Sequence, residues 1–244
     1  VERAAADAAI RATRMLGSVK PPSERLTVVL DPWVCAQFLG IVGGTLSGEM
    51  VLKGRSLFAD RLGEDVAAPW VTLIDDPTDP AAFTATATDG EGLATRRNVL
   101  VNSGRLDQFV HNSWTARRCG TSSTGSAVRG YSTTPGVGVQ AVSLLPGRDD
   151  PADLIAAIDD GVLLQSVTGL HSGVNPVSGD FSTGAEGLRI RNGELAEPLR
   201  EFTVGSTIQR MLLDVTGIGN DLEWQPMSAA GVTLVIGELT VSGA

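Results

Sequence analysis

The residues that could do chemistry are few and widely spaced in this chain. Its only two histidines, His111 and His171, stand sixty residues apart, and neither has a Glu or a His at helical spacing. A zinc hydrolase needs about three protein ligands and a general base, and His, Glu and Cys supply nearly all of them. We therefore expect both histidines to be ordinary surface or hydrogen-bonded residues. The sequence predicts no metal site in this chain.

Motifs for a nucleophile or a nucleotide lack the structural context that they need. No Gly-x-Ser-x-Gly elbow occurs, and Cys35 falls in an apolar stretch where a thiol stays protonated and inert. Residues 136–141 fit the dinucleotide pattern G-x-G-x-x-A, but no apolar strand precedes them and no helix follows. The paired acidic residues are predicted to be solvated at loops or helix ends: Asp75 and Asp76, Asp149 and Asp150, Asp159 and Asp160.

Residues 169–184 combine frequent glycine with Asn, Asp, Ser and His. This composition gives a tightly turned backbone with many side-chain hydrogen bonds, which suits either a binding loop or an array of structural turns. Composition alone favours the structural interpretation. The candidate peptide-contacting or loop-shaping residues in this segment are His171, Asn175, Asp180, Phe181 and Ser182, and two more stand further along the chain, Asn220 and Asp221.

The charge and hydropathy of the chain exclude several classes of protein. Lys and Arg total 19 against 28 Asp and Glu, a formal charge of −9, whereas a protein that binds nucleic-acid phosphates needs concentrated positive charge. No stretch approaches the roughly 18 apolar residues of a membrane-spanning helix. Cys35 and Cys119 are too few for a disulfide framework. We expect a soluble cytoplasmic protein with reduced thiols, and neither nucleic acid nor membrane as a partner.

The elements that must position these residues begin with a helix, a strand and a second helix. Residues 1–16 show helical periodicity, and residues 26–30 are a short β-branched strand. Asp31 is expected to cap the helix that Pro32 starts. That helix, through residue 46, is apolar nearly all round and is predicted to be buried.

Three glycines in the second helix predict close packing. Gly40, Gly43 and Gly44 cost a helix about 1 kcal/mol each relative to Ala, which indicates that something packs closely against it. Because the chain opens inside a helix, we expect it to be part of a longer protein.

The remainder of the sequence predicts mainly strands and tight turns. A strand is expected at residues 70–74, and turns at 102–104 and 192–193 are expected to form hairpins. Around the second turn, Leu188 and Ile190 alternate with Arg189 and Arg191, which predicts one buried and one wet face. Short helices are predicted from Asp150 and from Ser206, and a closing strand at 232–236.

Several short motifs together resemble one protein family. In order, they are the Asp89–Gly92 tetrapeptide D-G-E-G, the pair Arg96 and Arg97, the A-R-R-C-G run ending at Gly120, the N-P-V-S-G-D-F-S run from Asn175 to Ser182, the tetrapeptide E-F-T-V from Glu201, and G-N-D-L-E ending at Glu223. The set resembles the C-terminal portion of the TldD/PmbA family, and within it the PmbA (TldE) branch. The resemblance covers essentially the whole chain, and the family's N-terminal domain has no counterpart here.

This resemblance implies an α+β fold in two parts. Residues 1–88 would be the end of a central α/β region, and residues 89–244 a mainly antiparallel β domain with a few short helices. In the TldD branch, a helix with the motif H-E-x-x-x-H and a later Cys bind zinc. The corresponding positions here are Leu39, Gly40 and Gly44, and no cysteine follows Cys119. Leu and Gly offer zinc no lone pair, so the resemblance implies a degenerate metal site.

The function implied is that of a partner subunit without a cofactor of its own. TldE-like chains pair with a zinc-binding TldD-like subunit in a dimer that cleaves small or unfolded peptides inside a chamber. The label "modulator of DNA gyrase" attached to such proteins is read as a genetic one, because the acidic charge gives no support for contact with gyrase or DNA.

Two alternatives remain open at this point. One is a self-standing homodimeric peptide-binding protein. The other is a hydrolase with a relocated site that uses His111, His171, Asp180 or Glu186. The sequence does not identify the peptide substrate.

Overall fold

A computed structural model describes residues 2–243, with side chains described for residues 5–6 and 8–243. The fold is mixed α+β, as predicted. The helices are α1 (Glu2–Arg14), α2 (Pro32–Thr45), α3 (Gly48–Leu52), α4 (Ser113–Cys119), α5 (Pro151–Ala156), α6 (Leu170–Gly173) and α7 (Ile208–Leu213). The strands are β1 (Glu24–Leu30), β2 (Leu73–Asp75), β3 (Asn98–Asn102), β4 (Arg105–Leu106), β5 (Ala127–Val128), β6 (Gly136–Val137), β7 (Val142–Leu144), β8 (Asp160–Thr168), β9 (Asp180–Arg191), β10 (Glu194–Thr207), β11 (Val215–Ile218), β12 (Glu223–Trp224), β13 (Ala230–Gly231) and β14 (Leu234–Ser242).

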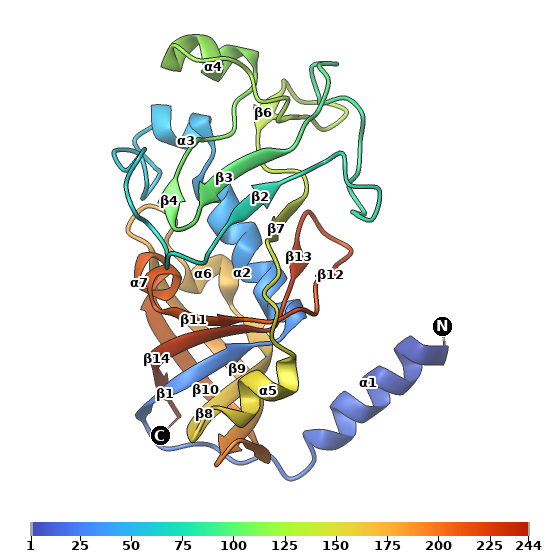
Figure 1. The fold of residues 1–244 in the computed structure, drawn as a ribbon, viewed down its shortest axis with the longest axis vertical. Helices are drawn as coiled ribbons and strands as arrows, with labels where there is room; N and C mark the ends of the chain where they lie inside the picture. Colours follow the sequence, from blue (N-terminus) through green and yellow to red (C-terminus); the bar gives the residue numbers. More distant parts are fainter. Residues whose placement is uncertain (1, 244) are drawn as a thin grey trace.

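Five strands close into a mixed barrel in the lower half of Figure 1. Their order is β1-β8-β9-β10-β14, and the pairing of β1 with β14 closes the ring. β1 and β8 run parallel, whereas the other neighbours are antiparallel. β11 extends the sheet beyond β14. Strands from both sides of residue 88 form this barrel, and the division into 1–88 and 89–244 stays a prediction.

The hairpin of β9 and β10 turns at residues 192–193, both with positive φ, as the Asn-Gly pair predicted. The predicted wet face is wrong at Arg189, which is 3% exposed, although Arg191 is exposed. The Arg189 guanidinium donates to both carboxylate oxygens of Asp160 on β8, at 2.5 and 2.8 Å, and to Glu24 on β1. Two carboxylates therefore compensate the buried charge where β1, β8 and β9 lie side by side.

α2 runs from the barrel into the upper half of the molecule (Figure 1). Its start is formed as predicted, because the Asp31 carboxylate accepts the Val34 N–H at 2.8 Å and Pro32 occupies the first turn. Burial raises the pKa of Asp31, and Arg11 donates to this carboxylate at 2.6 Å. The described side chains of α1 are exposed, and this ion pair joins that helix to the barrel.

The upper half is built on a small antiparallel sheet of order β4-β3-β2-β7. The predicted β3–β4 hairpin is confirmed, with positive φ at residues 103–104. The strand predicted at 70–74 is wrong in its first part, because β2 begins only at Leu73. Before it, the Val71 N–H closes a turn onto the Ala68 carbonyl, and the Trp70 indole donates to the Val215 carbonyl at 3.1 Å.

Asp75 at the end of β2 is fully buried, so the predicted solvation of this residue is wrong. One oxygen of its carboxylate accepts the N–H groups of Gln140 at 2.8 Å and Ala141 at 2.7 Å. The other oxygen is buried without a hydrogen-bond partner. Burial raises the pKa of this carboxyl to about 6. Asp75 thus fixes the segment that leads into β7 at the expense of a desolvated carboxyl group.

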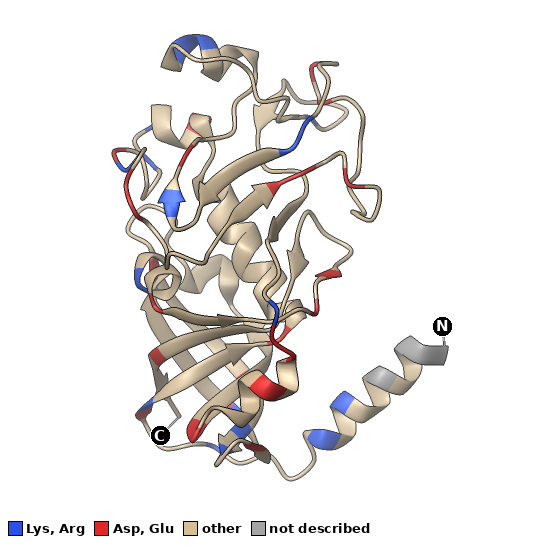
Figure 2. Cartoon of the chain, viewed as in Figure 1, with Lys and Arg blue, Asp and Glu red and all other residues tan. Residues whose placement is uncertain are grey.

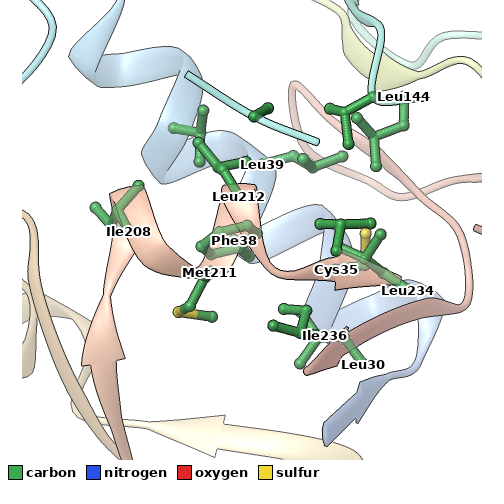
Figure 3. Close-up of a cluster of buried hydrophobic side chains, with 14 of the residues drawn as sticks. Leu30, Cys35, Phe38, Leu39, Leu144, Ile208, Met211, Leu212, Leu234 and Ile236 are labelled. Carbon is green, nitrogen blue, oxygen red and sulfur yellow. The ribbon is translucent and has the colours of Figure 1, made fainter. Parts of the chain in front are cut away.

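One hydrophobic core joins both halves of the molecule around α2. Side chains from α2, α7, the barrel strands and the small sheet meet there (Figure 3). A second, smaller cluster lies between α5 and the outer face of the barrel, and consists of Val29, Ile158, Leu163, Ile190 and Val235. No helix in residues 2–243 is long and apolar enough to cross a membrane.

Candidate functional site: the exposed face of α2

α2 is not buried all round, which corrects the sequence prediction. Trp33 and Gly44 are exposed, and Gln37 and Gly40 are half-buried. Their spacing of four, three and four residues places them on one side of a helix. We call these four residues the α2 glycine face. The sequence did not indicate this face because glycine adds no polar side chain to a hydropathy pattern.

The three glycines of α2 have different surroundings. A methyl group at Gly43 would lie 2.7 Å from Cγ2 of Val139, so close packing is confirmed there. The same expectation is wrong for Gly40 and Gly44, where an added methyl would meet no atom within 4 Å. The α2 glycine face is therefore an open stretch of helix backbone.

Leu39 lies away from this face, in the core. It is fully buried, and Figure 3 shows it among Phe38, Leu212 and Leu144. Zinc ligation needs lone pairs from His, Cys, Asp or Glu. An aliphatic side chain at Leu39 and hydrogen atoms at Gly40 and Gly44 do not fit this need. Within the residues that the structure describes, no three His, Cys, Asp or Glu side chains come together as a metal-binding group.

The two thiols have opposite environments. Cys35 lies in α2 with no exposed surface, and burial raises its pKa to about 12. Cys119 ends α4 and is exposed. The predicted burial of Cys35 is confirmed. This burial disfavours the thiolate, which is the nucleophilic form of a cysteine.

The segment rich in glycine and polar residues forms a turn that is stabilised from within. The Asn175 carboxamide accepts the N–H groups of Val177 at 2.9 Å and Ser178 at 3.3 Å. The Ser178 hydroxyl donates to Asp180 at 2.6 Å. Gln209 of α7 donates to the Ser178 carbonyl at 3.1 Å, and Thr207 caps that helix, one residue beyond the predicted start at Ser206.

Phe181 connects this turn to α2. Its ring meets Phe38 of α2 edge-on, with the ring centroids 6.1 Å apart, and Phe181 is 5% exposed. Its neighbours Asp180 and Ser182 are exposed, as is His171 on α6. Alternation along β9 accounts for this pattern, because successive side chains point to opposite faces of a strand.

Asn220 and Asp221 lie beside the start of β14. Both oxygens of Asp221 accept hydrogen bonds from Thr233, one from its N–H at 2.8 Å and one from its hydroxyl at 2.7 Å. The Asn220 N–H donates to the Asp149 carbonyl at 3.0 Å. These hydrogen bonds hold the loop before β12 against the residues that precede α5 and β14. None of these hydrogen bonds joins this loop to the 169–184 segment.

His111 and His171 occupy different parts of the structure. The ring of His111 is buried against α4, with Nδ1 at 3.2 Å from the Thr115 hydroxyl, and burial lowers its pKa. His171 is exposed on α6 next to β9. This arrangement agrees with the ordinary roles predicted for both residues, one hydrogen-bonded and one on the surface.

The fold and the α2 helix define a class of protein. A family model described as the PmbA/TldA metallopeptidase C-terminal domain matches residues 23–243. The chain therefore belongs to the PmbA/TldD metallopeptidase family, as the sequence resemblance predicted.

Individual relatives agree with this assignment. Metalloprotease PmbA of Escherichia coli O157:H7 is 26% identical over 238 residues, which cover 98% of this chain and 50% of the relative. A solved Thermotoga maritima structure, described as a modulator of a DNA gyrase, matches with a TM-score of 0.91 at 29% identity, covering 96% of this chain and 54% of that one. TldE from Thermococcus kodakarensis matches with a TM-score of 0.89 at 25% identity, covering 97% and 54%. The chain spans about half the length of these relatives.

Proposed function

We propose that this chain acts as a non-catalytic, PmbA/TldE-like subunit of a TldD/TldE-type zinc metallopeptidase. Its contribution is to the dimer and to the chamber in which small unfolded peptides are degraded or processed. The observation that carries the proposal is the chemistry of three positions on α2, Leu39, Gly40 and Gly44. At these positions a family member that binds zinc has His, Glu and His.

Each of the three positions lacks a group that the reaction needs. Leu39 packs into the core and supplies no lone pair. Gly40 supplies no carboxylate to act as general base, and Gly44 no second imidazole. The zinc ion and the general base are then expected in the TldD-like partner alone. This chain has the structural role of holding peptide by backbone pairing to a strand edge.

The α2 glycine face is the surface on this helix that another chain or a peptide can reach. An added methyl at Gly40 or Gly44 meets no atom within 4 Å, which supports free access to the helix backbone. Trp33 and Gln37 on the same face supply a large apolar contact and an amide.

The first experiment separates a partner subunit from an active peptidase. The purified chain is assayed for zinc by mass spectrometry and for cleavage of unstructured peptides, alone and after mixing with a TldD-like chain that carries H-E-x-x-x-H. We expect no zinc and no turnover from the chain alone, and co-elution with the TldD-like chain in size-exclusion chromatography. Stoichiometric zinc with turnover by the isolated chain would refute the proposal. A homodimer that does not bind the TldD-like chain would favour the self-standing peptide-binding protein.

The second experiment tests the α2 glycine face directly. Gly44→Arg adds a long side chain at a site where the fold leaves room, so thermal unfolding should change little. We expect this variant to lose complex formation or peptide binding. Leu213→Arg, an exposed position on α7, is the matched control. If Gly44→Arg behaves like this control in both assays, the face has no part in the function.

A further inference from the structure

The end of the molecule opposite the barrel carries arginines without acidic partners. Figure 2 shows Lys and Arg gathered on α4 at this end, and Asp and Glu on α5 at the other. Arg117, Arg118 and Arg129 are exposed and form no ion pair with any described residue. Two of them, Arg117 and Arg118, are adjacent on α4, in a chain with 28 acidic and 19 basic residues.

Contacts between loops place a fourth arginine near the segment that leads into α4. The Arg96 guanidinium donates to the Ser123 carbonyl, and the Ser123 hydroxyl donates at 3.2 Å to the His111 carbonyl, just before α4. We call Arg96, Arg117, Arg118 and Arg129, together with Trp114 of α4, the α4 basic patch.

The loop at Gly90 and Glu91 lies between Arg129 and α4. A methyl group at Gly90 would lie 3.2 Å from Cβ of Arg129. The next residue, Glu91, accepts the Ser113 N–H at 2.9 Å, where α4 begins. The loop at Gly90 and Glu91 therefore contacts both the residue that carries the Arg129 side chain and the start of α4.

Trp114 gives this surface an apolar centre. Its side chain is 51% exposed, and the Arg118 guanidinium carbon lies 6.0 Å from the ring centroid. Trp and Arg are among the residues most enriched in binding hot spots, and an arginine that stacks on an indole loses less side-chain freedom on binding. Exposure of this pair in the isolated chain indicates a contact surface for another molecule.

A crevice beside Trp114 shows what kind of molecule fits. Glu49, Glu91, Asn112 and Thr134 line it together with Trp114. The carboxylates of Glu49 and Glu91 repel any anionic group placed in this crevice, but they can accept N–H groups from a polypeptide backbone. A partner that satisfies both the arginines and this crevice carries its own carboxylates and also N–H donors. Nucleic acid carries a phosphate at every nucleotide, which is disfavoured by the crevice carboxylates and by the net charge of −9 of the whole chain.

We propose that the α4 basic patch binds an acidic segment of another polypeptide chain. The arginines pair with its carboxylates, Trp114 covers its apolar atoms, and the crevice accepts its backbone N–H groups. This surface is formed by α4 and the loops around it, so the proposal stands independently of the metal chemistry of α2.

Fluorescence anisotropy with three labelled probes tests the proposal on the full chain. The probes are a peptide of alternating Glu and Gly, the same peptide with Gln in place of Glu, and an oligothymidylate of equal charge. We expect binding of the Glu peptide to be about tenfold tighter than of the Gln peptide and to weaken as salt is added, because exposed charge pairs are screened. Equal binding of both peptides, or tighter binding of the oligothymidylate, would overturn the proposal.

Matched charge variants locate the binding surface. Arg117→Gln with Arg118→Gln removes two charges from the patch. Arg14→Gln with Arg148→Gln removes two exposed charges elsewhere that form no ion pair with a described residue. We expect about tenfold weaker binding of the Glu peptide for the first pair and less than about twofold change for the second. Equal losses in the two double variants would show a non-specific charge effect and reject the assignment. Trp114→Ala, at an exposed side chain, should weaken binding without lowering the melting temperature.

Discussion

At the scale of single residues, burial separates side chains that the sequence presents as equivalent. Asp75 and Asp76 are neighbours, yet Asp75 is fully buried in the small sheet and Asp76 is half-buried and contacts Arg97. Cys35 and Cys119 differ in the same way. Ionisation and reactivity follow from these differences, because a desolvated group resists becoming charged.

Thiol labelling should distinguish the two cysteines. Iodoacetamide at about pH 8 is expected to modify Cys119 alone in the folded chain, because burial keeps the Cys35 thiol protonated. Intact mass spectrometry should therefore find one adduct before unfolding and two after it. The variant Cys119→Ser should take up none while folded. Rapid modification of Cys35 in that variant would contradict the buried position of this residue.

Asp75 should make stability fall as the pH rises. Its pKa is raised from an ordinary 3.8 to about 6, so its contribution to stability is fully present below about pH 4 and is lost as the pH rises through about 6. The loss is about 3 kcal/mol at most. Asp75→Asn does not ionise and should therefore gain stability relative to the natural chain over this window. Urea unfolding at about pH 4 and about pH 7 measures the difference.

The control for this experiment is an exposed acidic residue whose side chain forms no hydrogen bond within the described part of the chain. Asp107→Asn changes an exposed carboxyl and should follow the natural chain at both pH values. If Asp75→Asn also follows it, the buried carboxyl does not carry the expected desolvation cost.

At the scale of elements, α2 combines a core helix with an open backbone face. Leu39 and Cys35 hold one side of the helix in the core, whereas Gly40 and Gly44 lie on the other. Glycine in a helix interior is less stable than alanine. Gly40 and Gly44 have room for a methyl group, so alanine at either position would make the fold more stable than glycine does. This is the expected signature of a surface kept open for another purpose, and it supports the partner role proposed for the helix.

Alanine substitutions along α2 should have opposite effects on stability. Gly44→Ala and Gly40→Ala are each expected to raise the free energy of unfolding by up to about 1 kcal/mol, because the new methyl group meets no atom. Gly43→Ala should lower it by about 1 to 2 kcal/mol, because the methyl overlaps Val139, a stiff β-branched side chain. Chemical denaturation of the three variants gives the comparison. A uniform gain in all three would show that Val139 does not pack against the helix.

At the scale of the whole molecule, closure of the barrel brings distant parts of the sequence together. Glu24, Asp160 and Arg189 come from three strands and form one ion cluster. The Arg189 side chain is 4% exposed, whereas Glu24 and Asp160 are 30% and 49% exposed. Water can therefore solvate the carboxylates if the arginine is removed, which limits the cost of losing it.

Substitutions at Arg189 and Arg191 measure how much this ion cluster contributes to the free energy of unfolding. Arg189→Met should lower the free energy of unfolding by about 2 to 3 kcal/mol, because it removes the charge that three strands share. Arg191→Met removes an exposed pair with Glu197 and should cost less than about 1 kcal/mol. Urea denaturation at neutral pH measures both. Equal small costs would mean that the cluster contributes nothing to barrel closure.

Local signals in the sequence account for much of the fold. The Asp31-Pro32 start of α2, the Asn-Gly hairpin at 192–193 and the turn at 103–104 were all predicted, since each depends on the conformational preferences of a few adjacent residues. The errors have a different origin. Arg189 was expected on the wet face of a strand and Asp75 at a solvated loop or helix end. Their burial depends on partners far along the chain, Glu24 for Arg189 and Gln140 for Asp75.

The candidate site shows the same division between local and long-range information. The motif positions Leu39, Gly40 and Gly44 were assigned by resemblance, but the sequence could not reveal that the two glycines share an open face with Trp33 and Gln37. Nor did two arginine pairs in the sequence reveal a patch, because Arg96 and Arg129 reach α4 only through loop contacts.

By itself, then, the sequence determined the family of this chain and the lack of ligand side chains on α2. It also determined the secondary structure at most of the tight turns and capped helix starts. These properties reside in short runs of residues, where backbone preference and side-chain chemistry act over a few ångströms. Only the tertiary structure decided which charges are buried, which glycines face open space and which arginines lie near α4. Burial and pairing depend on segments that approach one another after the barrel closes, and sequence spacing does not encode that approach.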